Sequence, residues 1–370
     1  MTLLSADEVQ QLALQVWGAT FAISLLVGVL IHRGHFCTLG AISDWVLMRD
    51  ASRLRQWALA VAVAMAGFGG MAWLGWLSPL NTIYASSQLS WLSALLGGGL
   101  FGIGMVLASG CSSKSLVRLA AGNLKSLVVL LAMAISALAA MRGLTAVWRV
   151  HGLDPVTIDL PHGPFAGQWL SAMTGLDLRA GLGISAALVS LLLGAWVLKD
   201  RRFQTVFNWV TGAGLGLLVV ALWWVSGVLG FVPEHPETLE PLFLTTQSAR
   251  MEALSFTAPV AFWLDAFLYY SDGSKRLTLG MVTVAGVLLG ACGSALQQGS
   301  FRWEGFTQRA DLVRHLVGGT LMGTGGVLAM GCTFGQGLSG LSTLSLGSMV
   351  SVLGIFGGTW AALQWQMRQD

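Results

Sequence analysis

One stretch of fifteen residues occurs twice in this sequence. Residues 97–111 (GGGLFGIGMVLASGC) match residues 318–332 (GGTLMGTGGVLAMGC) at ten of the fifteen positions. An internal duplication indicates that a chain is built from two related structural units. Each copy is apolar and rich in glycine, and each ends in a Gly-Cys pair. Duplication of such a segment in an apolar chain favours a transport path.

The composition is typical of an integral membrane protein. Hydrophobic residues make up 55% of the 370 positions and charged residues only 10%, and the mean hydropathy is +0.71. Soluble domains carry about 25% charged residues. We therefore predict an all-α integral membrane protein with about nine transmembrane helices. The windows of spanning length are 10–31, 56–77, 91–109, 125–147, 180–198, 208–230, 277–297, 313–330 and 346–366.

The basic residues predict the orientation in a bacterial inner (plasma) membrane. Alternate connections between the predicted spans carry 14 of the 20 lysines and arginines. By the positive-inside rule these connections are cytoplasmic, which places the N-terminus outside and the C-terminus in the cytoplasm. The first apolar run has no basic segment before it, so we expect it to be retained rather than cleaved. The net charge of +3 gives no support to a nucleic-acid partner.

A second similarity extends the duplication. Residues 35–38 (HFCT) correspond to residues 255–258 (SFTA) at an offset of 220. This predicts repeat one at 10–147 and repeat two at 208–366, with a connecting span at 180–198. Five spans separate the starts of the two repeats, and an odd number of crossings inverts the second copy. The sequence therefore predicts an inverted repeat.

Each predicted repeat also contains a segment too short or too polar to cross a bilayer. These segments, 37–50 and 256–270, are candidate re-entrant helices, and plain interfacial helices are the alternative. Glycines four residues apart recur in both copies and allow helices to approach closely. These glycine pairs are Gly98 with Gly102 and Gly319 with Gly323.

The ends of the duplicated stretches are candidate anion sites. At 110–113 and 331–337 the apolar run stops and small hydroxyl residues begin. Glycine can release backbone N–H groups from the helical ladder there, and a broken helix whose N–H groups face a lumen binds anions. The candidate residues in these segments are Gly110, Cys111, Ser112, Gly331, Cys332, Thr333 and Gln336.

Several of these assignments have plain structural alternatives. Lys114 and Arg118 could attract an anion near one mouth of a path, or they could anchor the chain at the lipid surface. Thr333 and Gln336 could donate hydrogen bonds to a substrate, or they could cap a helix. Ionisable residues at membrane depth are candidates for proton coupling. These residues are Asp44, Asp265 and His315.

The four cysteines stand singly, without CxxC or metal-ligand spacing. Cys292 lies in mid-span and is most simply a small buried hydrophobic residue. A membrane thiol oxidoreductase is a rival class, but it requires cysteines within disulfide range and a resolving pair. A noncatalytic subunit of a larger complex is a third class. We expect no catalytic residue, no cofactor and no metal, and without a nucleotide-binding GxxxxGK[ST] motif we expect no direct use of ATP.

Three motifs resemble the YeeE/YedE sulfur-transport membrane family. They are residues 33–44 (RGHFCTLGAISD), 108–118 (ASGCSSKSLVR) and 331–345 (GCTFGQGLSGLSTLS), and the likeness covers nearly the whole chain. The resemblance implies uptake of thiosulfate into the cytoplasm for sulfur assimilation through a narrow path, with a TusA-like cytosolic sulfur carrier as partner. Some members are linked to selenium, so another sulfur or selenium compound is an alternative substrate. The pore cysteines that the resemblance implies are Cys37, Cys111 and Cys332.

The chemistry of thiosulfate fits such a path. Thiosulfate is a dianion with a polarizable terminal sulfur, and an ion crosses a medium of low dielectric only where fixed dipoles replace its water. Backbone amides at broken helix ends supply such dipoles. A neutral thiol adds a weak S–H donor that can release its guest, whereas a thiolate would repel a dianion. We therefore expect the three cysteines to act as neutral thiols.

Overall fold

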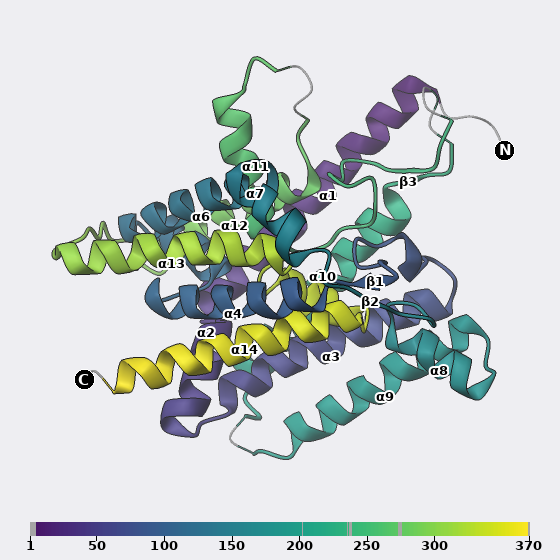
Figure 1. The fold of residues 1–370 in the computed structure, drawn as a ribbon, viewed down its shortest axis with the longest axis horizontal. Coiled ribbons are helices and arrows are strands. Elements are labelled where there is room, and N and C mark those ends of the chain that lie inside the picture. Colours follow the sequence, from purple (N-terminus) through teal and green to yellow (C-terminus); the bar gives the residue numbers. More distant parts are fainter. Residues whose placement is uncertain (1–4, 202, 235, 237–238, 273–275, 369–370) are drawn as a thin grey trace.

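The computed structural model describes nearly the whole chain and is almost entirely helical (Figure 1). In the described residues eight helical segments are long and apolar enough to cross a membrane, which confirms the prediction of an all-α integral membrane protein. The residues that are not described are 1–4, 202, 235, 237–238, 273–275 and 369–370.

The helices begin and end as follows. In the first half they are α1 (Ala6–Arg33), α2 (Thr38–Ser43), α3 (Ser52–Trp73), α4 (Trp91–Leu107), α5 (Ser112–Ala120), α6 (Leu124–Arg142) and α7 (Leu144–Trp148). In the second half they are α8 (Ala166–Thr174), α9 (Leu178–Leu198), α10 (Val206–Trp224), α11 (Thr257–Leu268), α12 (Leu279–Gln297), α13 (Arg309–Leu328) and α14 (Leu346–Met367).

Short elements complete the fold. Four π-helical turns are present among the described residues, at η1 (Asp44–Met48), η3 (Arg149–Leu153), η4 (Val225–Leu229) and η5 (Gly335–Gly340), with one 3₁₀ turn at η2 (Pro79–Asn81). Two antiparallel two-residue pairs join β1 (Gln88–Leu89) to β2 (Ile158–Asp159) and β3 (Phe231–Val232) to β4 (Leu242–Phe243).

A helix occupies each of the nine predicted windows, but eight segments rather than nine meet the length and hydropathy expected of a span in the described chain. The exception is α13, whose 20 residues are long enough to cross. Its first two turns are polar, with Arg309, Asp311, Arg314 and His315, so its apolar part begins only after them. The expected short helices are also present, as α2 with η1 and as α11.

The long helices pack in matched pairs. α4 lies along α14 just as α13 lies along α6, and α1 lies along α12 just as α10 lies along α3. α4 and α13 also pack directly on each other, and Figure 1 shows α13, α4 and α14 as successive layers. α9 packs on α3 and α8, outside this scheme. The two helices that carry the duplicated stretch therefore pack against each other.

The predicted glycine pairs lie at these close helix contacts. A Cβ atom added to Gly98 in α4 would lie 2.3 Å from the carbonyl oxygen of Ser351 in α14. A Cβ atom added to Gly319 in α13 would lie 2.7 Å from the carbonyl oxygen of Val129 in α6. Both distances are too short for any side chain, so these helices approach backbone to backbone.

Candidate functional site

The helices α4 and α13 end in the same way, immediately before a cysteine. Ser109 and Met330 both adopt a left-handed conformation with φ of 55°. The amide of Gly110 donates to the carbonyl five residues earlier at 2.9 Å, and the amide of Gly331 does the same at 2.8 Å. This hydrogen-bond pattern is the Schellman motif that terminates helices. It turns the chain out of each helix and directs Cys111 and Cys332 inward.

Each of the three predicted cysteines lies at the beginning of a short helical segment. The sulfur of Cys37 accepts a hydrogen bond from the backbone N–H three residues downstream at 3.4 Å, and the sulfur of Cys332 does the same at 3.4 Å. Cys111 is the N-cap residue of α5. Because backbone N–H groups hold the sulfurs of Cys37 and Cys332 as acceptors, the hydrogens of these two thiols are available as donors.

The structure brings the duplicated motifs together. The Cys37 thiol and the Thr333 side chain both lie next to the Cys111 thiol. The Cys111 sulfur is also 3.1 Å from Ser113 Oγ. Cys111 and Cys332 are fully buried. We call Cys37, Cys111, Cys332 and the residue after each of them the thiol centre.

A buried hydroxyl group follows each of these cysteines. Thr38, Ser112 and Thr333 are 2%, 0% and 1% exposed. Among the described residues none of the three hydroxyl oxygens has a hydrogen-bond partner of normal geometry. A buried hydroxyl without a partner costs about 1–3 kcal/mol, which a guest that accepts hydrogen bonds would recover.

Aromatic rings form an apolar wall beside the thiol centre. Phe334, which follows Thr333, packs against Phe36 at 5.6 Å and against Phe256 at 5.2 Å between ring centroids. All three rings are almost completely buried. Phe36 and Phe256 occupy corresponding positions of the second sequence similarity. The wall lowers the local dielectric, which strengthens any hydrogen bond that a guest makes with the thiols and hydroxyls.

A positively charged cavity of about 430 Å³ lies on one side of the thiol centre. Cys37 and Ser109 line it, and its described lining contains three fixed cations and no carboxylate. We call it the basic cavity. Its basic residues are His35, Arg53, Lys114 and Arg118.

A second cavity, of about 270 Å³, reaches the other duplicated motif through Ala329, Met330 and Gln336. Its described lining contains one cation, Arg149, and one carboxylate, Asp154. We call it the serine-lined cavity. Its serines are Ser86, Ser90, Ser93, Ser345, Ser348 and Ser351.

The two cavities lie at opposite ends of α4. Ser93 near the start of α4 lines the serine-lined cavity, and Val106 near its end lines the basic cavity. Thirteen residues of helix separate them by about 20 Å. Ser351 and Leu363 of α14 divide between the cavities in the same way. The thiol centre therefore lies between two cavities that open toward different ends of the helices.

The remaining predicted residues take distinct positions. Gln336 donates through Nε2 to the carbonyl of Ala329 at 2.6 Å, so its amide group caps the end of α13, while its buried oxygen has no partner among the described residues. Lys114 lines the basic cavity, and Arg118 donates to the carbonyl of Ser109 at 2.8 Å. Both cations thus line the basic cavity.

The two aspartates among the candidates for proton coupling are in ion pairs. Asp44 pairs with Arg53 at 3.3 Å, and Asp265 pairs with Arg142 at 3.6 Å. Cys292, in α12, is partly buried against the hydrophobic core, as expected of a small apolar residue. All four cysteines belong to the described part of the chain, and each is a free thiol.

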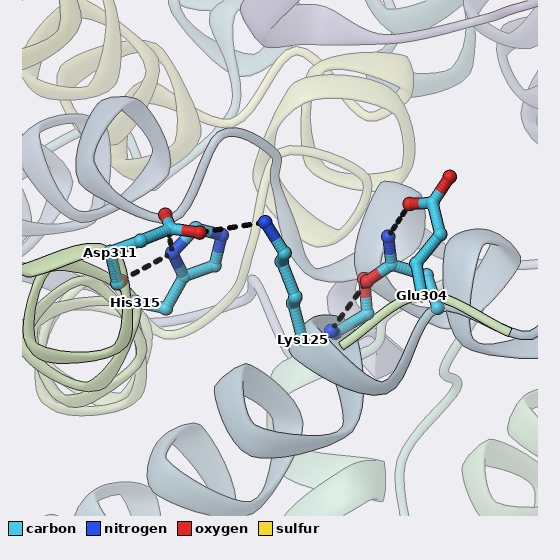
Figure 2. A network of polar contacts seen from close by, with 6 residues as sticks. Lys125, Glu304, Asp311 and His315 are labelled. Atoms are coloured by element: carbon cyan, nitrogen blue, oxygen red, sulfur yellow. Dashed lines mark hydrogen bonds and ion pairs between the residues drawn. The ribbon is translucent and has the colours of Figure 1, made fainter. Parts of the chain in front are cut away.

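His315 belongs to a polar network that joins α13 to α6. Figure 2 shows Asp311 between Lys125 and His315, with Lys125 Nζ at 2.7 Å and His315 Nδ1 at 3.0 Å from its carboxylate oxygens. The aromatic ring of Phe306 covers both His315 and Lys125. The network lines a cavity that shares Ser109 with the basic cavity.

Comparison with known proteins shows the family of this chain. The family model described as sulphur transport matches residues 33–361. The chain belongs to this family. It is 27% identical over 343 residues to the thiosulfate transporter TsuA of Spirochaeta thermophila, covering 91% of this chain and 95% of the relative. It is 26% identical over 347 residues to the thiosulfate transporter TsuA of Escherichia coli, covering 90% and 91%. This member of the sulphur transport family is a membrane transporter rather than an enzyme.

Sequence reasoning missed several residues of the site. Thr38 was not predicted, although the sequence contains a signal for it, because each of the three cysteines is followed by serine or threonine. The serines of α14 and the pair Arg149 and Asp154 lie outside the cysteine motifs in the sequence, and the fold brings them to the serine-lined cavity. Phe334 lies inside a predicted motif, but its ring partners could not be known.

Proposed function

We propose that this protein carries thiosulfate into the cytoplasm along a path from the serine-lined cavity, through the thiol centre, to the basic cavity. The observation that carries the proposal is the buried meeting point of both duplicated motifs. It holds thiols whose sulfurs are fixed by backbone N–H groups and hydroxyls that have no partner among the described residues. These thiols and hydroxyls can each donate a hydrogen bond, which suits a small anion.

The helix ends add to the attraction for an anion. α5 begins directly after Cys111 and η5 begins shortly after Cys332, so the N-terminal ends of both segments face the thiol centre. The partial positive charge of such ends favours a dianion. A thiol meets the soft terminal sulfur of thiosulfate without a strong bond, so the guest can leave again. In this conformation Cys111 and Cys332 are buried, and passage requires local movement.

The same proposal assigns the two faces of the membrane. The basic cavity contains Arg53, Lys114 and Arg118, which the positive-inside rule assigns to the cytoplasm. The serine-lined cavity then opens outside the bacterial inner membrane, with the N-terminus outside and the C-terminus in the cytoplasm. We also propose that residues 10–147 and 208–366 form an inverted repeat around α4 and α13, which the matched helix pairs and helix ends support.

A cytosolic partner fits this orientation. The basic cavity attracts the anion that leaves the thiol centre, and a soluble carrier at its mouth would prevent the anion from returning. We therefore propose a TusA-like sulfur carrier as the partner at this face. Binding of such a carrier to the purified transporter, measured at low and high salt, tests this: we expect binding that weakens with salt, and no binding at low salt would exclude the partner.

The main test is uptake of ³⁵S-labelled thiosulfate by proteoliposomes containing the wild type or single Cys→Ser variants. Serine keeps a hydroxyl donor but removes the soft sulfur atom. We expect Cys37→Ser, Cys111→Ser and Cys332→Ser to lose most uptake. Cys292→Ser is the matched control, because Cys292 lies in α12 and lines neither of the two cavities, and we expect it to transport normally.

Two results would contradict the proposal. Wild-type protein that transports no thiosulfate would exclude the substrate, and direct uptake of labelled selenium or other sulfur oxyanions by the same proteoliposomes would then identify an alternative. Undiminished uptake by all three variants would exclude the role of the thiols.

A further inference from the structure

The serine-lined cavity contains a single ion pair. Arg149 Nε lies 3.5 Å from Asp154 Oδ2, and Arg149 Nε makes no hydrogen bond within the described structure. Both residues come from the turn around η3, which follows α7 on the side that we assign to the exterior. Arg149 is the only cation among the described residues that line this cavity.

The carboxylate of this pair is connected to the path. Asp154 Oδ1 accepts a hydrogen bond from Ser93 Oγ at 3.0 Å. The same serine oxygen lies 3.2 Å from the carbonyl oxygen of Leu328, the last residue of α13. Three residues farther along the chain Gly331 leads into Cys332. The ion pair therefore lies in the cavity that leads to the thiol centre rather than on a remote surface.

The pair is loose enough to open. Its side chains are 24% and 32% exposed, and partly exposed pairs at such distances contribute at most about 1 kcal/mol. The hydrogen bond from Ser93 gives Asp154 a second partner, so the carboxylate keeps one when Arg149 turns away. A guanidinium group binds planar or tetrahedral oxyanions through two parallel N–H donors, which a lysine cannot do.

We propose that Arg149 captures the anion in the serine-lined cavity and that Asp154 is its built-in competitor. An arriving dianion displaces the carboxylate from Arg149, and the carboxylate returns when the anion moves on to the thiol centre. The competition sets the affinity for external substrate and disfavours singly charged anions, which displace a carboxylate less well. This inference rests on the proposed transport of thiosulfate.

The test is the concentration dependence of thiosulfate uptake by cells or right-side-out vesicles, so that only the outer face meets substrate. We expect Arg149→Gln to raise KM about tenfold with Vmax nearly unchanged, and Arg149→Lys to restore only part of the affinity. We expect Asp154→Asn to lower KM, because the competitor is gone. Arg179→Gln is the matched control, since Arg179 lines a different cavity, and we expect an unchanged KM.

The Asp154 variant keeps the test decisive if Arg149→Gln folds poorly, because a gain of affinity cannot arise from misfolding. A KM that is unchanged in Arg149→Gln, or one that Asp154→Asn raises, would overturn the inference and make the pair a structural brace of η3. Either result with an active wild type leaves thiosulfate transport standing. An inactive wild type would instead remove the proposed function itself.

Discussion

The serine-lined cavity and the basic cavity lie on either side of the same thiol centre, yet they differ in charge. The first has one cation held by a carboxylate among its described lining residues, and the second has three fixed cations and no carboxylate. The helices that end beside them, α4 and α13, carry the duplicated sequence and end with the same hydrogen bonds. The two sides therefore share the backbone geometry of their helix ends and differ in the charged side chains that line the cavities.

The side chains that differ come from outside the duplicated stretch. His35 and Arg53 flank α2 and η1, whereas Arg149 and Asp154 follow α7. A duplicated backbone can thus supply two equivalent helix ends, while the charged residues of the flanking segments give each cavity a different electrostatic potential. An electrostatic potential that becomes more positive along the proposed path would favour movement of an anion toward the basic cavity.

The largest expected effect is a loss of stability on adding a side chain where the backbones of α4 and α13 touch. A Cβ atom at Gly104 would lie 2.6 Å from the carbonyl oxygen of Gly318, and one at Gly325 would lie 2.6 Å from that of Gly97. Because backbone cannot yield as a side chain can, we expect Gly104→Val and Gly325→Val each to cost about 3 kcal/mol or more. Thermal unfolding and the yield of monodisperse protein in detergent measure this loss.

Gly99→Val is the control for these variants. No atom lies within 4 Å of a Cβ placed at Gly99, so we expect little change in unfolding. Destabilisation of only one of Gly104→Val and Gly325→Val would contradict the structural equivalence of α4 and α13.

A smaller effect concerns the hydroxyls of the thiol centre. Thr333→Val removes a buried hydroxyl that has no partner among the described residues, so we expect equal or higher stability. We expect uptake to fall about tenfold or more, since a hydrogen bond to a charged guest contributes about 1.5–3 kcal/mol. Uptake and thermal unfolding are measured on the same preparation.

The control for this change is Thr359→Val. The Thr359 hydroxyl donates to the carbonyl of Ile355 at 2.7 Å within α14, so it already has its partner. We expect its uptake to match the wild type. A loss of stability in Thr333→Val, with transport falling only in proportion to folded protein, would mean that this hydroxyl serves the fold alone.

The smallest effect concerns the basic cavity. Lys114→Gln removes one of its three fixed cations, and a partly exposed charge is worth about 0.5–1 kcal/mol. We expect the KM for efflux from the cytoplasmic side to rise two- to fivefold and to depend less on salt, while the KM for uptake from outside changes little. Lys199→Gln, at the end of α9 and outside this cavity, is the control. An equal rise on both sides would contradict the separation of the two cavities.

Sequence patterns predicted the fold better than the site. Hydropathy located the helices because bilayer thickness fixes the length of a span. The duplication identified α4 and α13 as a related pair because both copies of the repeated stretch end in Gly-Cys. The residues around the thiol centre that depend on contacts distant in sequence, such as Phe36 against Phe334, were not predictable. The sequence predicted α13 as a ninth span because its later turns are apolar. Its polar first turns are the reason that only eight of the described segments qualify as spans.

The most direct measurement of the central claim is X-ray diffraction at the selenium edge from crystals soaked in selenosulfate, the selenium analogue of thiosulfate. We expect one strong selenium peak between the two cavities, in contact with the sulfur of Cys111 and with Thr333. A peak only at a site away from Cys37, Cys111 and Cys332, such as the network of Lys125 and His315, would contradict a path through the thiol centre.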